Sequence, residues 1–123
     1  MSENIPTVAL TIKGGNKELK VEKNKEFNVA LQGNPTTGYS WYMSNVDEVK
    51  NSNAIEILNL NKYNGADDYV HDPHEPGMAG FGGTYYFKFK VKEANGDLPK
   101  LLFVYKRAWE NNAESNAEIT LKF

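Results

Sequence analysis

The stretch GNPTTGYSW, residues 33–41, places two hydroxyl side chains in a segment whose backbone is unusually restricted. Pro35 holds its own φ at about −65° and pushes the asparagine before it toward an extended conformation. Gly38 can adopt a positive φ or let another backbone approach closely. Thr36 and Thr37 supply short hydroxyl groups that lose little rotamer freedom when they are held in place. These hydroxyls suit either an ordinary β-turn that caps its own backbone or a loop that meets a partner.

A second stretch with unusual composition, residues 63–83, is long and ends in the segment Gly80-Phe81-Gly82-Gly83. Structureless connections beyond about 12–15 residues are uncommon in compact domains and are usually functional or disordered. Glycines expose backbone N–H and C=O groups, which can lie along a partner's groove or pair with its edge. The alternative is a mobile hinge that leads into the next strand. A phosphate-binding role is not favoured, because a strand and not a helix follows.

The same stretch contains both histidines of the chain, with acidic residues around them, and this composition suggests a metal site. Their spacing allows two imidazole ligands and one carboxylate. No distant third ligand can be named, so a solvated acidic loop is the favoured interpretation, and we expect no cofactor. The residues concerned are Asp67, Asp68, His71, Asp72, His74 and Glu75.

A third stretch, YKRAWE at residues 105–110, places an arginine and a tryptophan at the end of an apolar run. Arg107 can cover Trp109 through a cation–π contact as part of ordinary core packing. Tryptophan and arginine are also the residue types that are enriched among interface hot spots.

The elements that position these stretches follow a period of two, which is typical of β-strands. The clearest case is TYYFKFKVK, in which aromatic and aliphatic residues alternate with lysines, whereas LLFVYK is apolar on both faces like a doubly covered central strand. The segment VDEVKN at 46–51 can form one helical turn at most, and glycines predict a turn at 14–16. The expected strands cover residues 8–12, 26–32, 39–43, 55–62, 84–93, 100–106 and 117–123.

This pattern predicts a single all-β domain over residues 1–123, an immunoglobulin-like antiparallel β-sandwich of seven to eight strands. If successive strands run antiparallel, the connections at 33–38, 63–83 and 107–116 emerge at the same end. They are the three connections with unusual composition. Because loops on a rigid scaffold commonly carry function, we expect that end to bind a partner.

Composition excludes several classes of function. The net charge of −2 leaves no basic surplus for nucleic acid or acidic lipid, and the absence of cysteine removes disulfides, thiolate metal sites and a cysteine nucleophile. An enzyme is not favoured, because the two histidines share one loop and no nucleophile motif is present. We find no signal peptide and no run of ~20 apolar residues that would span a membrane. A cytoplasmic location is the default, with a vesicular or lysosomal one also open.

Taken together and in order, the three stretches resemble the chagasin family of inhibitors of cysteine peptidases. That family carries an N-P-T-T-G-[YF] loop, a G-x-G-G segment and an R-P-x-W or R-P-W type loop on an immunoglobulin-like sandwich. Residues 34–39 and 80–83 match the first two in full, and 107–109 match the third except that Ala108 stands where the family usually has proline. The residues that the resemblance assigns to peptidase binding are Asn34, Pro35, Thr36, Thr37, Gly38, Tyr39, Gly80, Phe81, Gly82, Gly83, Arg107 and Trp109.

The resemblance implies a reversible, competitive inhibitor of papain-like (clan CA) cysteine peptidases that is monomeric when free. It implies that Thr36 and Thr37 lie nearest the catalytic Cys–His pair, that the glycine segment follows one side of the cleft, and that Trp109 stacks on the other side. Arg107 would then orient its loop or pair with an acid on the cleft rim. Without the proline, the third loop is expected to be less rigid and its binding weaker or more selective.

The alternative function is an immunoglobulin-like carbohydrate-binding or adhesion module. Its aromatic platform would consist of Tyr39, Phe81 and Trp109.

Overall fold

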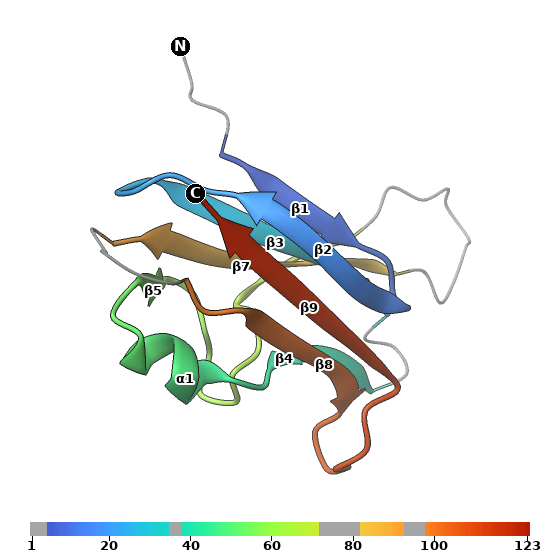
Figure 1. Cartoon of the computed structure of the whole chain (residues 1–123). Helices are drawn as coiled ribbons and strands as arrows, with labels where there is room; N and C mark the ends of the chain where they lie inside the picture. Colours follow the sequence, from blue (N-terminus) through green and yellow to red (C-terminus); the bar gives the residue numbers. More distant parts are fainter. Residues whose placement is uncertain (1–4, 35–37, 72–81, 93–97) are drawn as a thin grey trace.

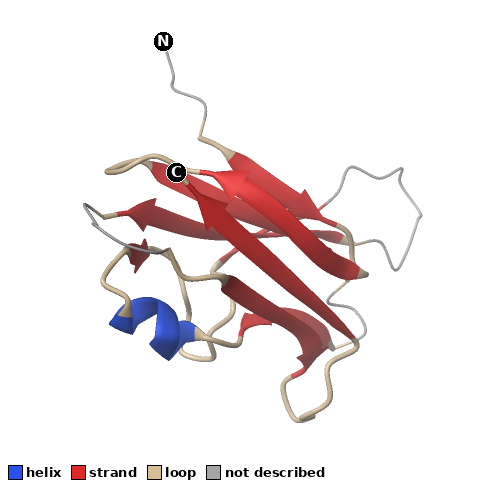
Figure 2. Ribbon diagram, in the orientation of Figure 1, coloured by secondary structure: helices blue, strands red, loops and turns tan. Residues whose placement is uncertain are grey.

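The computed structural model describes residues 5–34, 38–71, 82–92 and 98–123, which form two β-sheets packed face to face with one short helix beside them (Figures 1 and 2). In the described part of the chain, no helix is both long and apolar enough to cross a membrane. The elements are β1 (Thr7–Leu10), β2 (Gly14–Lys20), β3 (Glu26–Gly33), β4 (Tyr39–Met43), α1 (Val46–Asn51), β5 (Ile55–Ile57), β6 (Asp68–His71), β7 (Gly83–Val91), β8 (Leu101–Arg107) and β9 (Ser115–Lys122).

One sheet has the strand order β1-β3-β7-β5, with β6 also pairing with β7, and the other has the order β2-β9-β8-β4. The all-β immunoglobulin-like sandwich is therefore confirmed. The described residues contain nine strands, more than the seven to eight expected. Two pairs, β1 with β3 and β2 with β9, are parallel, and the remaining pairs are antiparallel.

The alternating residues of β3 and β7 build the centre of the core. Phe27 pairs with Phe89 across the two strands, and their rings stack with centroids 5.2 Å apart. Phe87 reaches Phe103 of the opposite sheet, with ring centroids 4.7 Å apart. These four side chains and Trp41 are almost completely buried. Such aromatic pairs stabilise the sandwich beyond the burial of their area.

The turn expected at residues 14–16 lies slightly earlier in the chain. The N–H of Gly14 donates to the carbonyl of Thr11 at 2.9 Å, and Gly14 then begins β2. Gly14 has a φ of +72°, and a Cβ there would collide with the backbone carbonyl of Asn116 on β9. The glycine is therefore required by the close approach of two paired strands. Strand β2 is mostly exposed, so it has no apolar alternation to reveal it in the sequence.

The strand expected over residues 55–62 is shorter and ends at Ile57. Further along the same edge, β7 pairs instead with β6, which lies inside the stretch 63–83 that was expected to be one long connection. Between β5 and β6, the side-chain amide of Asn59 makes the hydrogen bonds to β7 that the backbone of a longer strand would make. Its Nδ2 donates to the carboxylate of Asp68 at 2.8 Å and to the carbonyl of Tyr86 at 2.7 Å, while its Oδ1 accepts from the N–H of Lys88 at 2.9 Å. The hydrogen bond from Asn59 also lowers the pKa of Asp68. One side chain thus joins β6 and β7.

Two further expectations need correction. The helix α1 has six residues, more than the one turn of about 3.6 residues expected, because Val46 and Val49 both face the core. The outer face of β8 is not covered by a second layer, since Leu102 and Val104 are half-buried while the residues that alternate with them are buried.

Candidate functional site

The strand ends at the predicted binding end are brought together by the register of the two sheets. Gly33 at the end of β3 pairs with Gly83 at the start of β7, and Tyr39 at the start of β4 pairs with Arg107 at the end of β8. The connection between β8 and β9 projects beyond both sheets at the bottom of Figure 1. Of the predicted site, Pro35, Thr36, Thr37, Gly80 and Phe81 lie outside the described residues.

The first loop is held at its base by the hydroxyl of Tyr105. This oxygen accepts the N–H of Asn34 at 2.9 Å and lies 3.4 Å from the carbonyl of Asn34, to which it donates. The side chain of Tyr105 is only 3% exposed and belongs to β8, the strand that leads into the third loop. Buried tyrosine hydroxyls need such partners, and here the partner is loop backbone. The first loop is therefore tied to the strand that carries the third.

The end of the second loop packs tightly against the first. A Cβ at Gly82 would lie 2.5 Å from the carbonyl oxygen of Gly33 and 3.9 Å from the Cβ of Asn34. A Cβ at Gly83 would collide with the hydroxyl of Tyr69 and the carbonyl of Val70. Gly82 and Gly83 thus allow close packing within the protein, a use that sequence reasoning did not consider for this segment beside a partner's groove or a mobile hinge.

The third loop turns tightly around an arginine. The N–H of Glu110 donates to the carbonyl of Arg107 at 3.1 Å, and the two side chains form an ion pair at 3.2 Å. The guanidinium carbon of Arg107 lies 4.7 Å from the ring centroid of Tyr39 and 5.9 Å from that of Trp109. Cation–π attraction favours this placement between two aromatic rings. The indole itself is 73% exposed and points away from the core.

Gly38 completes the contact between the first and third loops. Its φ of +84° is in the region that side-chain-bearing residues rarely adopt. A Cβ at this position would lie 3.2 Å from the Cη2 atom of Trp109. The absence of a side chain at Gly38 therefore lets the backbone of this residue lie directly beneath the exposed indole.

Aromatic side chains form a floor beneath these loops. The rings of Tyr39 and Tyr105 stack with centroids 5.4 Å apart, and Trp41 follows at 5.1 Å from Tyr105. The indole N–H of Trp41 donates to the carbonyl of Gln32 at 2.9 Å. Tyr85 shares a hydrogen bond of 3.0 Å with Ser40, and burial raises the pKa of its phenol, which remains neutral near pH 7. Sequence reasoning placed Tyr39 in the site but did not assign Tyr105, Trp41 or Tyr85 to it.

We expect Tyr105→Phe to weaken inhibition of a target peptidase about three- to tenfold, while the protein remains folded. The ring stacking would persist, but Asn34 would lose both hydrogen bonds to the phenol, each worth about 1 kcal/mol, and about half of that loss is expected to weaken binding while the rest lowers stability. The measurement is the inhibition constant together with thermal unfolding. Tyr86→Phe, on the outer face of β7, is the matched control. Unchanged inhibition by Tyr105→Phe would show that the phenol does not position the first loop.

The chemistry of this end is that of a binding surface. It presents an exposed indole, backbone groups at closely packed glycines, and an arginine held between aromatic rings. Among the described residues, no three potential metal-ligating side chains gather at one place. Of the six residues of the suggested metal site, Asp67, Asp68 and His71 belong to the described chain, while Asp72, His74 and Glu75 lie outside it. An immunoglobulin-like sandwich that gathers an exposed indole, an arginine and closely packed loop bases at one end is typical of a binding module.

Comparison with known proteins identifies the class more closely. Residues 20–123 match the chagasin family of peptidase inhibitors, family I42, so the chain belongs to this family. It is 33% identical over 115 residues to Amoebiasin-1 from Entamoeba histolytica, covering 94% of this chain and 96% of that protein. The solution structure of Amebosin is similar with a TM-score of 0.57 and 27% identity, over 97% of this chain and 100% of that one.

The fold is also shared by the cysteine protease inhibitor EhICP2 from Entamoeba histolytica, with a TM-score of 0.60 and 16% identity over 99% of both chains. Membership of the family confirms the predicted class, a protein inhibitor of peptidases and not an enzyme. The carbohydrate-binding or adhesion module is not favoured. The roles of individual site residues and the cellular location stay predictions.

Proposed function

We propose that the protein blocks the active-site cleft of a papain-like cysteine peptidase reversibly and competitively, using the three loops at one end of the sandwich. The observation that carries this proposal is the direct contact among the loop bases. Tyr105 binds Asn34, Gly82 packs on Gly33, and Trp109 lies over Gly38. A surface assembled in this way before binding loses little conformational freedom when it meets a partner.

The chemistry of the cleft suits the residues of the first loop. A papain-like site holds a thiolate beside an imidazolium at the cleft floor. Thr36 and Thr37 would meet this pair with hydroxyl groups, and a rigid loop without a well-placed scissile carbonyl would not be cleaved. The segment from Gly80 to Gly83 would follow one wall of the cleft, and Trp109 would contact an aromatic surface on the other. Three loops of this size are sufficient for a standard interface of about 1,600 Å².

The structure supports one of the two roles considered for Arg107, that of orienting its own loop. Its guanidinium is engaged by Glu110 and lies against Tyr39, so an acid on the cleft rim would have to compete with both. These contacts compensate for the absence of proline at Ala108. They restrict the turn from 107 to 110 by side-chain interactions, where the family's proline would restrict it through φ.

We expect Glu110→Gln to weaken inhibition about two- to fivefold, because an exposed ion pair of this kind contributes under about 1 kcal/mol. Adding Ala108→Pro to the same chain is expected to restore the inhibition constant. Position 108 is the second residue of the turn closed by Glu110 and Arg107, where proline is favoured. The association rate constant is the measurement that reports loop order. If proline fails to rescue the Glu110 variant, the ion pair does more than restrict the turn.

The proposed function is tested by titrating papain with the purified protein while cleavage of a small peptide substrate is followed. We expect sub-micromolar inhibition whose apparent constant rises with substrate concentration, and recovery of activity on dilution. A serine peptidase such as trypsin serves as the control for nonspecific effects. No inhibition of papain at about 10 µM by folded protein, well above the dissociation constants of specific inhibitor complexes, would count against the proposal.

A further inference from the structure

A hollow of about 320 Å³ lies on the outer face of the β4–β8 pair, beside the third loop. It follows the side of the sandwich and not the end that carries the three loops. Of the residues assigned to peptidase binding, none lines it, although Ala108 of the third loop does. The residues that line it are Tyr42, Met43, Ser44, Tyr63, Asn64, Val104, Lys106 and Ala108.

Lys106 gives the hollow a positive charge on a protein whose net charge is −2. The ammonium of Lys106 lies 5.9 Å from the ring centroid of Tyr42. Lys62 does not line the hollow itself, but its ammonium lies 5.1 Å from the ring centroid of Tyr63, which does. None of the described residues that line the hollow carries a carboxylate. Lys106 donates one hydrogen bond, to the carbonyl of Glu110 at 3.1 Å, and an ammonium can donate three. The hollow is therefore complementary to an acidic side chain.

The hollow is continuous with the surface that the proposed function assigns to the peptidase. Ala108, which lines it, precedes Trp109, the most exposed of the large apolar side chains in the described chain, and Tyr63 is the next most exposed at 65%. The two exposed aromatic rings thus belong to one surface that runs from the third loop to the connection after β5. Exposed aromatic residues of this kind are typical anchors at protein interfaces.

We propose that this hollow is a fourth contact with the peptidase, and that it receives an acidic side chain from a surface segment beside the cleft wall that Trp109 contacts. Lys106 and Lys62 pair with the carboxylate, and Tyr63 packs against the segment that carries it. This inference rests on the proposed function, since it needs a peptidase held by the three loops. The contact would distinguish among peptidases whose clefts are alike but whose flanking segments differ in charge.

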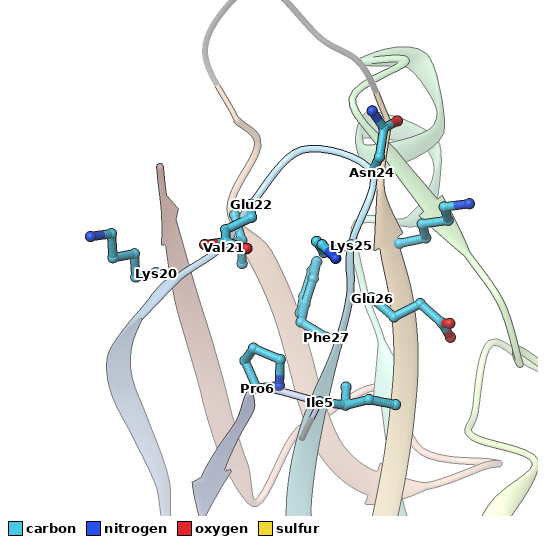
Figure 3. Close-up of a pocket in the computed structure, with 10 residues that line it drawn as sticks. Ile5, Pro6, Lys20, Val21, Glu22, Asn24, Lys25, Glu26 and Phe27 are labelled. Atoms are coloured by element: carbon cyan, nitrogen blue, oxygen red, sulfur yellow. The ribbon is translucent and has the colours of Figure 1, made fainter. Parts of the chain in front are cut away.

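The experiment compares Tyr63→Ala and Lys106→Met with two controls at the opposite end of the molecule. There, a second hollow of about 680 Å³ is lined by Lys20 among other residues (Figure 3), and Phe123 is 49% exposed. Lys20→Met and Phe123→Ala therefore remove the same kinds of side chain where no loop-bound peptidase can reach. The probe is papain, with inhibition constants measured at low and high ionic strength.

We expect Tyr63→Ala and Lys106→Met each to raise the inhibition constant about five- to tenfold, and the effect of Lys106→Met to shrink at high salt. Both controls should leave it within about twofold. Because Lys106 also contacts the third loop, Tyr63→Ala is the decisive variant. If wild-type protein inhibits papain and Tyr63→Ala matches it, the fourth contact is refuted while the inhibitor function stands. If wild-type protein does not inhibit papain, both proposals fail together.

A second measurement tests the acidic chemistry directly. Treatment of the papain complex with a water-soluble carbodiimide joins a lysine amine to a carboxylate that it touches. Mass spectrometry should then find a link from Lys106 or Lys62 to an aspartate or glutamate of papain, and Lys20 should form none. Links only at other lysines would show that the hollow does not receive an acid.

Discussion

Replacing Trp109 with alanine is expected to weaken peptidase inhibition about a hundredfold, the size of effect seen when an interface anchor is truncated. The indole is 73% exposed in the free protein, so its removal should change the free energy of unfolding by less than about 0.5 kcal/mol. Arg107 and Gly38 already hold it in place, which limits the freedom that it loses on binding. The inhibition constant for papain and the thermal unfolding midpoint are the two measurements.

Phe123→Ala is the matched control for Trp109→Ala, since it removes an exposed aromatic ring from the opposite end of the sandwich. It should leave inhibition unchanged. A Trp109 variant that still inhibits within about threefold of the wild type would show that the third loop contributes shape but little binding energy.

Replacing Gly82 with valine has the second large expected effect, and this one acts on both stability and inhibition. A Cβ at Gly82 would lie 2.5 Å from the carbonyl oxygen of Gly33, a distance that forces one backbone to move. Overpacking of this kind costs about 1–3 kcal/mol. Because the displaced backbone joins the bases of the first and second loops, inhibition should weaken more than about tenfold.

Chemical denaturation and the papain assay measure the two effects of Gly82→Val separately. Ala9→Val adds the same kind of branched side chain at an exposed position of β1, and it should alter neither. If Gly82→Val lowers stability but leaves inhibition intact, the packing of Gly82 on Gly33 supports the fold without positioning the loops.

Several strands could be predicted because a buried face repeats every second residue. In β7 the apolar alternation matches the observed burial, and in β3 it does so except at Ala30, which is buried although the pattern places it on the opposite face from Val29 and Leu31. Strands β2 and β6 could not be predicted in this way. The first is mostly exposed, and the second is joined to β7 partly by the side chain of Asn59, so neither leaves a regular pattern.

The candidate site also contains residues that the sequence could predict and residues that it could not. The motifs identified Asn34, Gly38, Arg107 and Trp109 as site residues through their residue types and order. In the structure, Gly38 and Arg107 both lie against the indole of Trp109. Tyr105 was not assigned because an inward-facing tyrosine in a strand is indistinguishable from a core residue. Its role depends on the hydroxyl reaching Asn34, 71 residues earlier in the chain.

The amino-acid sequence alone determined the fold class, the family resemblance and the residue types that a binding loop needs, because these depend on local periodicity and on short motifs. Only the tertiary structure decided which groups hold those motifs in place. The hydrogen bonds from Tyr105 to Asn34, the packing of Gly82 on Gly33 and the enclosure of Arg107 between Tyr39 and Trp109 each join segments far apart in the chain. Such contacts arise from strand register and sheet packing, which no local pattern specifies.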